Sequence, residues 1–282
     1  MNNGSGIYAK IMQDILSGDA SLPTLPDVAL RIRRAMQDPA CDLVKIEDII
    51  KTDAGLSAHL IQMANSPLYR GWRQTKDLKR AVSIFGMEMT RNLCLSYSLK
   101  AMFRFKNPQL KTFMQTAWKE SARRAAFSAL LAGHCRRISA DRALLGGLLQ
   151  EIGLPLLYLR LEKYPEALEN PEIINGLVDA FGAKISIALL ESWGFDQELQ
   201  EVARSRRDWF RNDSRKPELA DIVLLANLHL LYLADSDNLE LPPIDSLPAY
   251  IKLNPGPVSQ RGTLQILDEA TDIGELEAAI AG

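Results

Sequence analysis

Apolar residues recur at intervals of three and four along almost the whole chain, whereas a sustained alternation of apolar and polar residues is absent. The first pattern places apolar side chains on one face of a helix, and the second is typical of a half-buried strand. In the segment 42–50, for example, Leu43, Ile46, Ile49 and Ile50 share one face. The sequence therefore predicts an all-α fold.

Short polar residues and prolines mark where the predicted helices begin and end. Asp42 and Asp53 each precede an apolar run, where a carboxylate can accept hydrogen bonds from the free N–H groups of a first turn. Pro67 ends the second of these helices, because proline cannot continue the backbone hydrogen-bond ladder. A short helix over residues 77–86 and a longer amphipathic helix over residues 87–105 are expected to follow.

Breaks in this periodicity divide the chain into four parts. We expect an N-terminal helix or extension over residues 1–19, a first helical lobe over 20–108, a second helical lobe over 109–235 and a proline-containing extension over 236–282. The stretch after Ala234 carries nine acidic residues against two basic ones, and it is interpreted as a loop followed by a short acidic helix. Its removal is expected to leave both lobes folded.

Composition narrows the class of protein. With 282 residues, of which 47% are hydrophobic, the chain is long enough to bury a core and to form two lobes. The 33 basic and 35 acidic residues give a net charge of −2, so no overall basic charge points to nucleic acid or to a membrane surface. No stretch approaches the ~18 uninterrupted apolar residues of a membrane span, and we expect a cytoplasmic protein.

Cysteine usage agrees with that compartment. Cys41, Cys94 and Cys135 are odd in number, widely spaced and without a CxxC pair. Thiols of this kind are typical of a reducing environment, where they serve as small buried apolar residues.

Several separated segments resemble the bacterial HDOD domain family. These are LPTLP at 22–26, IIKTDAGLSAHLIQMANSPLY at 49–69, AVSIFG at 81–86, Trp118 with Ser121, GGLLQEIG at 146–153, Phe181-Gly182 and LLESWGF at 189–195. They follow the family's order and spacing over about residues 20–235. The resemblance implies an all-helical relative of HD-domain metal-dependent phosphohydrolases that mostly acts as a regulatory or scaffolding module in bacterial signal transduction.

The resemblance also implies where a metal site would lie. HD hydrolases hold a divalent metal with several histidines and an adjacent His-Asp pair, since neutral imidazole and carboxylate bind the ion and let it acidify a bound water. This chain has three histidines, and none precedes an aspartate. The corresponding positions here are Glu120, Gln150, Glu151, Gly182, Arg206 and Arg207.

Arginine does not lose its proton in a protein and therefore cannot ligate a metal. We accordingly expect no metal, no cofactor and no catalysis at these positions. A carboxylate that remained after loss of a cation would need another positive charge, so a network is expected in which Arg206 and Arg207 bind Glu120 and Glu151. The predicted function is a non-catalytic regulatory module that binds a signalling protein.

Two other functions remain open. A metal-dependent phosphohydrolase could use carboxylates such as Glu120 and Glu151 as ligands. A helical nucleic-acid-binding module could use the stretch 70–106, in which nine basic residues stand against two acidic ones. The candidate basic face comprises Arg70, Trp72, Arg73, Lys76, Lys79 and Arg80. We favour an acidic protein partner, or the acidic segment of this chain, over nucleic acid as the occupant of this face.

Overall fold

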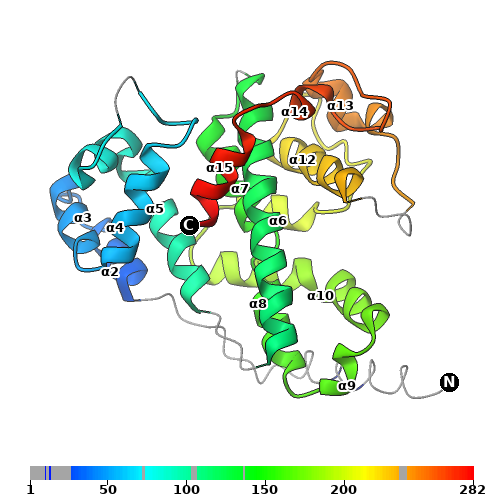
Figure 1. Cartoon of the computed structure of the whole chain (residues 1–282), viewed down its shortest axis with the longest axis horizontal. Helices are drawn as coiled ribbons and strands as arrows, with labels where there is room; N and C mark the ends of the chain where they lie inside the picture. The colour runs from blue at the N-terminus through cyan, green and yellow to red at the C-terminus, as the bar shows by residue number, and fades with distance from the viewer. Residues whose placement is uncertain are drawn as a thin grey trace.

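The computed structural model describes residues 10, 13, 27–71, 74–102, 107–135, 137–234 and 240–282. Within these residues the chain forms helices joined by short connections, and its extended pairing is one isolated antiparallel bridge between Val258 and Leu264. The all-α prediction is confirmed (Figure 1). The LPTLP motif lies outside the described residues, as does the predicted 1–19 extension apart from residues 10 and 13.

The first lobe consists of α2 (Asp27–Ala35), α3 (Leu43–Ile50), α4 (Ala54–Ala64) and α5 (Leu78–Met102). The predicted caps are confirmed: the carboxylate of Asp42 accepts from the backbone N–H of Lys45 at 2.9 Å, and that of Asp53 from Leu56 at 3.0 Å. The element α5 comprises the two helices predicted over 77–105 as far as Met102, and they meet at Gly86, where the backbone is not helical and φ is 70°. Glycine tolerates this left-handed conformation because it has no Cβ.

The second lobe is built around the long helix α6 (Figure 1). Its helices are α6 (Pro108–Gly133), α7 (Ala140–Leu149), α8 (Leu154–Leu161), α9 (Pro165–Leu168), α10 (Pro171–Ser192), α11 (Gln197–Arg204) and α12 (Leu219–Leu233). The apolar helix α7 packs closely on α6, because a Cβ at Gly147 would lie 2.7 Å from the Cα of Ala125. The core of the first lobe continues into this one, since Ala122 and Leu144 belong to the same apolar cluster as Leu60.

The segment after α12 forms η1 (Ile244–Ser246), α13 (Pro248–Leu253), α14 (Gln265–Asp268) and α15 (Ile273–Ala281). It differs from the expected dispensable extension. Leu247 and Leu264 are completely buried in the core formed with α12, and Leu276 and Ile280 are buried in the core of the first lobe. These buried apolar residues are widely spaced among acidic residues and prolines, so the composition of the segment does not indicate that it belongs to the core.

Two helical stretches are long and apolar enough to cross a membrane, Ala140–Leu161 and Pro171–Ser192. The apolar window of the first is 78% buried inside the protein, as core helices are, and that of the second is 44% buried. The core helices of soluble proteins pass the same test of length and composition, so these two stretches do not by themselves indicate a membrane span.

Candidate functional site

The positions singled out from the sequence come from four elements of the second lobe. Glu120 lies on α6, Gln150 and Glu151 directly follow α7, Gly182 lies in α10, and Arg206 and Arg207 directly follow α11. The structure brings Glu151, Gly182 and Arg206 into contact.

Glu151 is the centre of the site. Its Oε1 accepts a hydrogen bond from Nη1 of Arg206 at 3.0 Å, and its Oε2 accepts one from Nη2 of Arg124 at 2.8 Å. The side chain of Arg124 is 2% exposed and that of Arg206 is 6% exposed. The predicted pair between Glu151 and Arg206 is therefore present, and a second buried guanidinium occupies the other carboxylate oxygen.

Gly182 makes room for the first of these arginines. A Cβ at this position would lie 2.9 Å from Nη1 of Arg206, closer than non-bonded atoms approach each other. The residue is buried in the middle of α10, so the missing side chain leaves space that the guanidinium fills. The guanidinium of Arg206 can therefore lie here because residue 182 has no side chain.

Asp179, one turn before Gly182 on α10, binds both arginines that follow α11. Its Oδ1 accepts from Nη2 of Arg206 at 2.9 Å and from Nη1 of Arg207 at 2.5 Å. The side chain of Arg207 is 39% exposed, so this residue lies at the edge of the site. The expectation that Arg207 pairs with Glu120 or Glu151 is wrong, because Asp179 on the neighbouring helix is the carboxylate that it reaches.

The expected role of Glu120 in the network is also wrong. Its side chain is exposed on α6, and it makes no hydrogen bond or ion pair with the described residues. The pKa of Glu120 is raised, mainly because the group is partly removed from water. The nearby charge of Glu151 also raises this pKa, and that of Arg124 lowers it. Arg124, one turn further along α6, is the residue that reaches Glu151.

Gln150 points away from this network. Its Nε2 donates to the backbone oxygen of Val202 on α11 at 3.3 Å, and the side chain is buried. It therefore links α7 to α11 and does not join the charged groups around Glu151.

The electrostatics of the site favour charged, paired groups. Burial raises the pKa of Glu151, but Arg124, Arg206 and Arg207 outweigh it, and the pKa is lowered overall. Burial lowers the pKa of Arg206. The neighbouring arginines lower this pKa further, whereas Glu151 raises it. A guanidinium stays protonated at any ordinary pH. The site therefore holds two buried cationic groups of the protein, Arg124 and Arg206, one on each oxygen of the Glu151 carboxylate.

Metal-ligand chemistry gains no support from the arrangement. Both oxygens of Glu151 are bound by guanidinium groups, and no histidine lies among these residues. Across the part of the chain that the structure describes, no group of three or more His, Cys, Asp or Glu side chains could hold a metal ion. The residues present do not fit a divalent metal.

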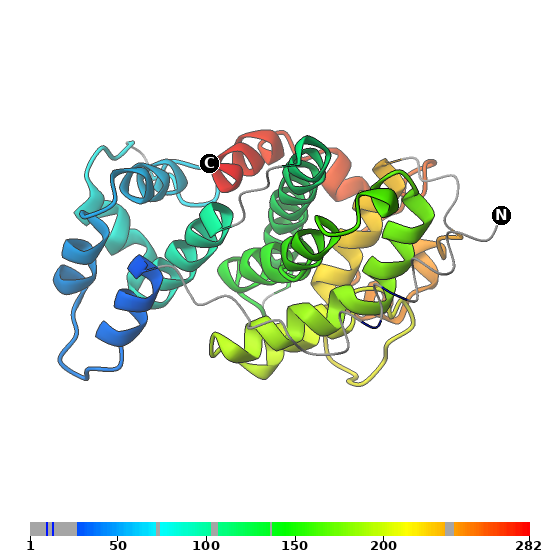
Figure 2. The same ribbon diagram turned by 90° about the horizontal axis from the view of Figure 1, so that it is seen from below.

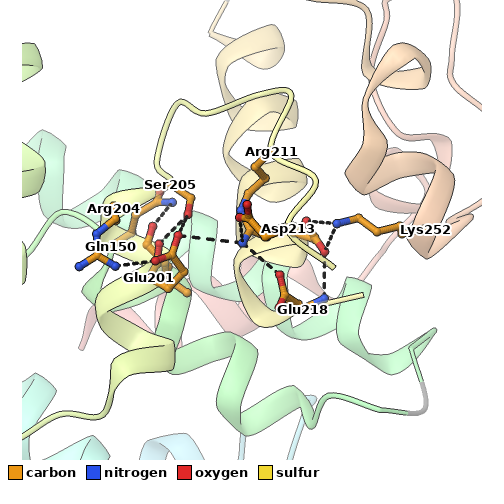
Figure 3. Close-up of polar contacts among 10 residues, drawn as sticks. Gln150, Glu201, Arg204, Ser205, Arg211, Asp213, Glu218 and Lys252 are labelled. Atoms are coloured by element: carbon orange, nitrogen blue, oxygen red, sulfur yellow. Dashed lines mark hydrogen bonds and ion pairs between the residues drawn. The ribbon is translucent and has the colours of Figure 1, made fainter. Parts of the chain in front are cut away.

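A second buried network supports the segment that carries Arg206 (Figure 3). The Arg211 side chain is 2% exposed, and it donates to Asp221 at 2.8 Å, to Glu218 at 3.0 Å and to Asp213 at 3.1 Å. Nζ of Lys252, on α13, lies 2.7 Å from the second carboxylate oxygen of Asp221. The network fixes the loop between α11 and α12 and ties α13 to it.

On the predicted basic face, Arg70 binds the last helix of the chain. Its Nη1 donates to Glu275 of α15 at 3.0 Å, and its Nη2 lies 3.6 Å from Asp272. Lys76, Lys79 and Arg80 are exposed. Trp72 and Arg73 lie outside the described residues. The acidic segment of the chain itself therefore occupies one end of this face.

Comparison with known proteins adds a family and a fold. A family model described as HDOD domain matches residues 22–208. A protein named "Putative metal-dependent phosphohydrolase" from Shewanella amazonensis SB2B is 24% identical, with a TM-score of 0.80 and coverage of 100% of this chain and 99% of that chain. An HDOD domain protein with unknown function from Geobacter sulfurreducens is 18% identical, with a TM-score of 0.68 and coverage of 98% of both chains. At these identities the solved structures establish a shared fold.

A curated relative is known as well. An uncharacterised protein of Treponema pallidum (strain Nichols) is 23% identical over 238 residues, which make up 79% of this chain and 45% of that protein. The chain thus spans about half the length of the curated relative that it matches.

Proposed function

This chain belongs to the HDOD domain family, and from that membership we propose that it is a non-catalytic regulatory module that acts in signal transduction by binding other proteins. The family match covers residues 22–208 and agrees with the resemblance seen in the sequence. Beyond family membership, we propose that the protein does not catalyse a reaction and that it acts by binding other proteins.

One observation supports the proposal that the protein is not catalytic. The guanidinium of Arg206 lies against Gly182 and on Glu151, where the family's metal ligands would be required. A catalytic metal must bind several neutral imidazoles and carboxylates and still keep a position for water. Arg124 and Arg206 instead neutralise the central carboxylate, and a divalent cation placed beside them would be repelled.

The experiment that tests this measures metal content and hydrolysis together. The purified protein is incubated with Mn²⁺, Mg²⁺ or Ni²⁺ and assayed on cyclic dinucleotides, nucleotides and aryl phosphates. We expect no stoichiometric metal and no turnover. Metal-dependent hydrolysis that is lost in Glu151→Gln, but retained in the control Glu172→Gln at an exposed position of α10, would overturn the proposal and favour a phosphohydrolase.

Nucleic acid is the less supported partner. Arg70, at the start of the basic stretch, is bound by two acidic residues of α15, so part of its charge is already neutralised within the chain. Binding to duplex DNA would weaken steeply with salt in proportion to the phosphates neutralised. Specific binding with such a slope would favour the nucleic-acid alternative over a protein partner.

A further inference from the structure

The helix α15 lies across both lobes of the protein. In Figures 1 and 2 it runs between the helices of the first lobe and α6. Leu276, Ala279 and Ile280 are buried, and Ile273 packs against the apolar clusters on either side. The spacing of Ile273, Leu276 and Ile280 is i, i+3, i+7, which is the pattern of a helix bound in a groove.

The surface that receives α15 is formed by α4 and α6, and we call it the α15 groove. On α6, Ala122, Ala126 and Ala129 belong to the same apolar cluster as the buried residues of α15. Their small side chains let a helix approach closely. Leu60 and Met63 of α4 belong to that cluster too, so both walls contribute buried apolar side chains. Each wall also donates one hydrogen bond to the backbone of α15, from Gln62 to Ala278 at 3.4 Å and from Trp118 to Ala281 at 3.2 Å.

Two arginines form a basic rim beside the groove. Arg70 lies 3.0 Å from Glu275 and 3.6 Å from Asp272, and Nε of Arg123 donates to Glu277 at 3.0 Å. The rim comes from both lobes, because Arg70 follows α4 and Arg123 lies on α6. The groove therefore selects a helix with one apolar face and acids beside it.

The helix α15 is less deeply buried than α12, the most buried helix of the second lobe. Three of its nine residues are buried, whereas twelve of the fifteen residues of α12 are buried. The arginine side chains of its ion pairs are 44% and 47% exposed, so solvent and salt screen these pairs. A helix of this length has little stability on its own. The helix α15 is accordingly expected to open locally while the rest of the protein stays folded.

We propose that the α15 groove is a docking surface for an acidic amphipathic helix of a partner protein, and that α15 occupies it as an internal competitor. The inference rests on the proposed function and names the surface and the chemistry of the partner. When α15 leaves, apolar walls and the free charges of Arg70 and Arg123 become available to a helix of the same pattern.

The test uses the full chain and a labelled peptide with the sequence of residues 270–282. The variant Glu275→Lys with Glu277→Lys repels α15 from the basic rim without altering a fully buried side chain. We expect the peptide to bind this variant at least about tenfold more tightly than the wild type, since the competing helix is loosened. A matched control, Glu166→Lys with Glu172→Lys, changes the net charge equally at exposed positions and should bind as the wild type does.

Two further measurements make the proposal decidable. A peptide in which Leu276 and Ile280 are replaced by Asp should not bind, and adding Arg70→Glu to the loosened variant should weaken binding of the unaltered peptide. Equal affinity for wild type, loosened variant and control would overturn the proposal. If the loosened variant does not fold, hydrogen exchange of the wild type decides: α15 amides should exchange at least about a hundredfold faster than α12 amides, and equal protection would overturn the proposal.

These outcomes are separate from those of the hydrolysis assay. Metal-dependent turnover would overturn the proposed non-catalytic function without changing the expected peptide affinities. Absence of peptide binding would remove the docking surface and leave the arginine-filled site as described.

Discussion

Arg206 fills the space that Gly182 leaves open, with its Nη1 2.9 Å from the place where a Cβ would be. Gly182 lies within α10 and Arg206 in the turn that follows α11, and the HDOD resemblance implies metal-ligand positions at both. The close fit of these two residues leads to the first prediction.

Gly182→Ala should destabilise the protein by about 1–3 kcal/mol, because the added methyl group overpacks the site and pushes Arg206 away from Glu151. The free energy of unfolding in urea measures this. The control is Gly274→Ala on α15, where nothing lies within 4 Å of the added Cβ, and where alanine should stabilise the helix by roughly 0.5–1 kcal/mol. Equal effects of both substitutions would show that Arg206 needs no space at Gly182.

Glu151→Ala should destabilise the protein by roughly 3–5 kcal/mol, because it leaves the buried guanidinium groups of Arg124 and Arg206 without their carboxylate. Chemical denaturation of the variant measures the loss, and the exposed Glu172→Ala should change stability by no more than ~0.5 kcal/mol. A loss below about 1 kcal/mol for Glu151→Ala would mean that the network adds nothing to the fold.

Stability should fall as the pH drops towards 4, because of His229. This residue is completely buried, and its Nδ1 accepts from the backbone N–H of Leu264 at 3.1 Å. Burial lowers its pKa to about 4, an effect that Asp268 partly opposes. In the unfolded chain the histidine pKa is near 6.5, so the unfolded chain binds a proton at a higher pH than the folded protein does. The stabilisation that depends on neutral His229 is therefore fully present above about pH 6.5 and decreases below it, by about 3 kcal/mol at pH 4.

Unfolding free energies measured between pH 7 and pH 4.5 test this. His229→Gln retains a hydrogen-bond acceptor and removes the titration, so the variant should show a shallower decline than the wild type. His134→Gln, at an exposed position, should retain the wild-type slope. Identical slopes for all three proteins would assign the pH dependence to carboxylates elsewhere.

Leu264→Ala should destabilise the protein by about 2–5 kcal/mol, because Leu264 is completely buried beside α12. Ile251→Ala, 70% exposed on α13, should be close to neutral. Thermal unfolding compares the two. Deletion of residues 240–282 should consequently unfold the protein or make it insoluble, and a cooperatively folded truncation product would refute the assignment of this segment to the core.

The helical fold and the helix starts at Asp42 and Asp53 could be predicted from local sequence, because capping and periodicity depend on neighbouring residues. The spacing of the HDOD motifs predicted that Glu151, Gly182 and Arg206 share one site, and these residues do lie together in the structure. Arg124 and Asp179 were missed because they do not occupy ligand positions. A signal existed for both: Arg124 lies four residues after Glu120, and Asp179 three before Gly182, so each shares a helix face with a candidate position.

The Arg211 network had no comparable signal. It joins Asp221 at the start of α12 to Lys252 on α13, and nothing in the sequence around either residue indicates that the chain returns to this point. The burial of Leu247 and Leu264 was missed for the same reason. Such contacts depend on tertiary packing between segments that are far apart in the chain.

The fit between Gly182 and Arg206 also restricts how histidines could be introduced at the two positions where the HDOD resemblance implies metal ligands. A histidine introduced at position 182 while Arg206 remains would collide with the guanidinium, because even a Cβ lies too close to it. A histidine introduced at position 206 first would leave a gap beside Gly182 and remove one partner of Glu151. Either order passes through a less stable intermediate, so the two substitutions would have to occur together to avoid that loss of stability.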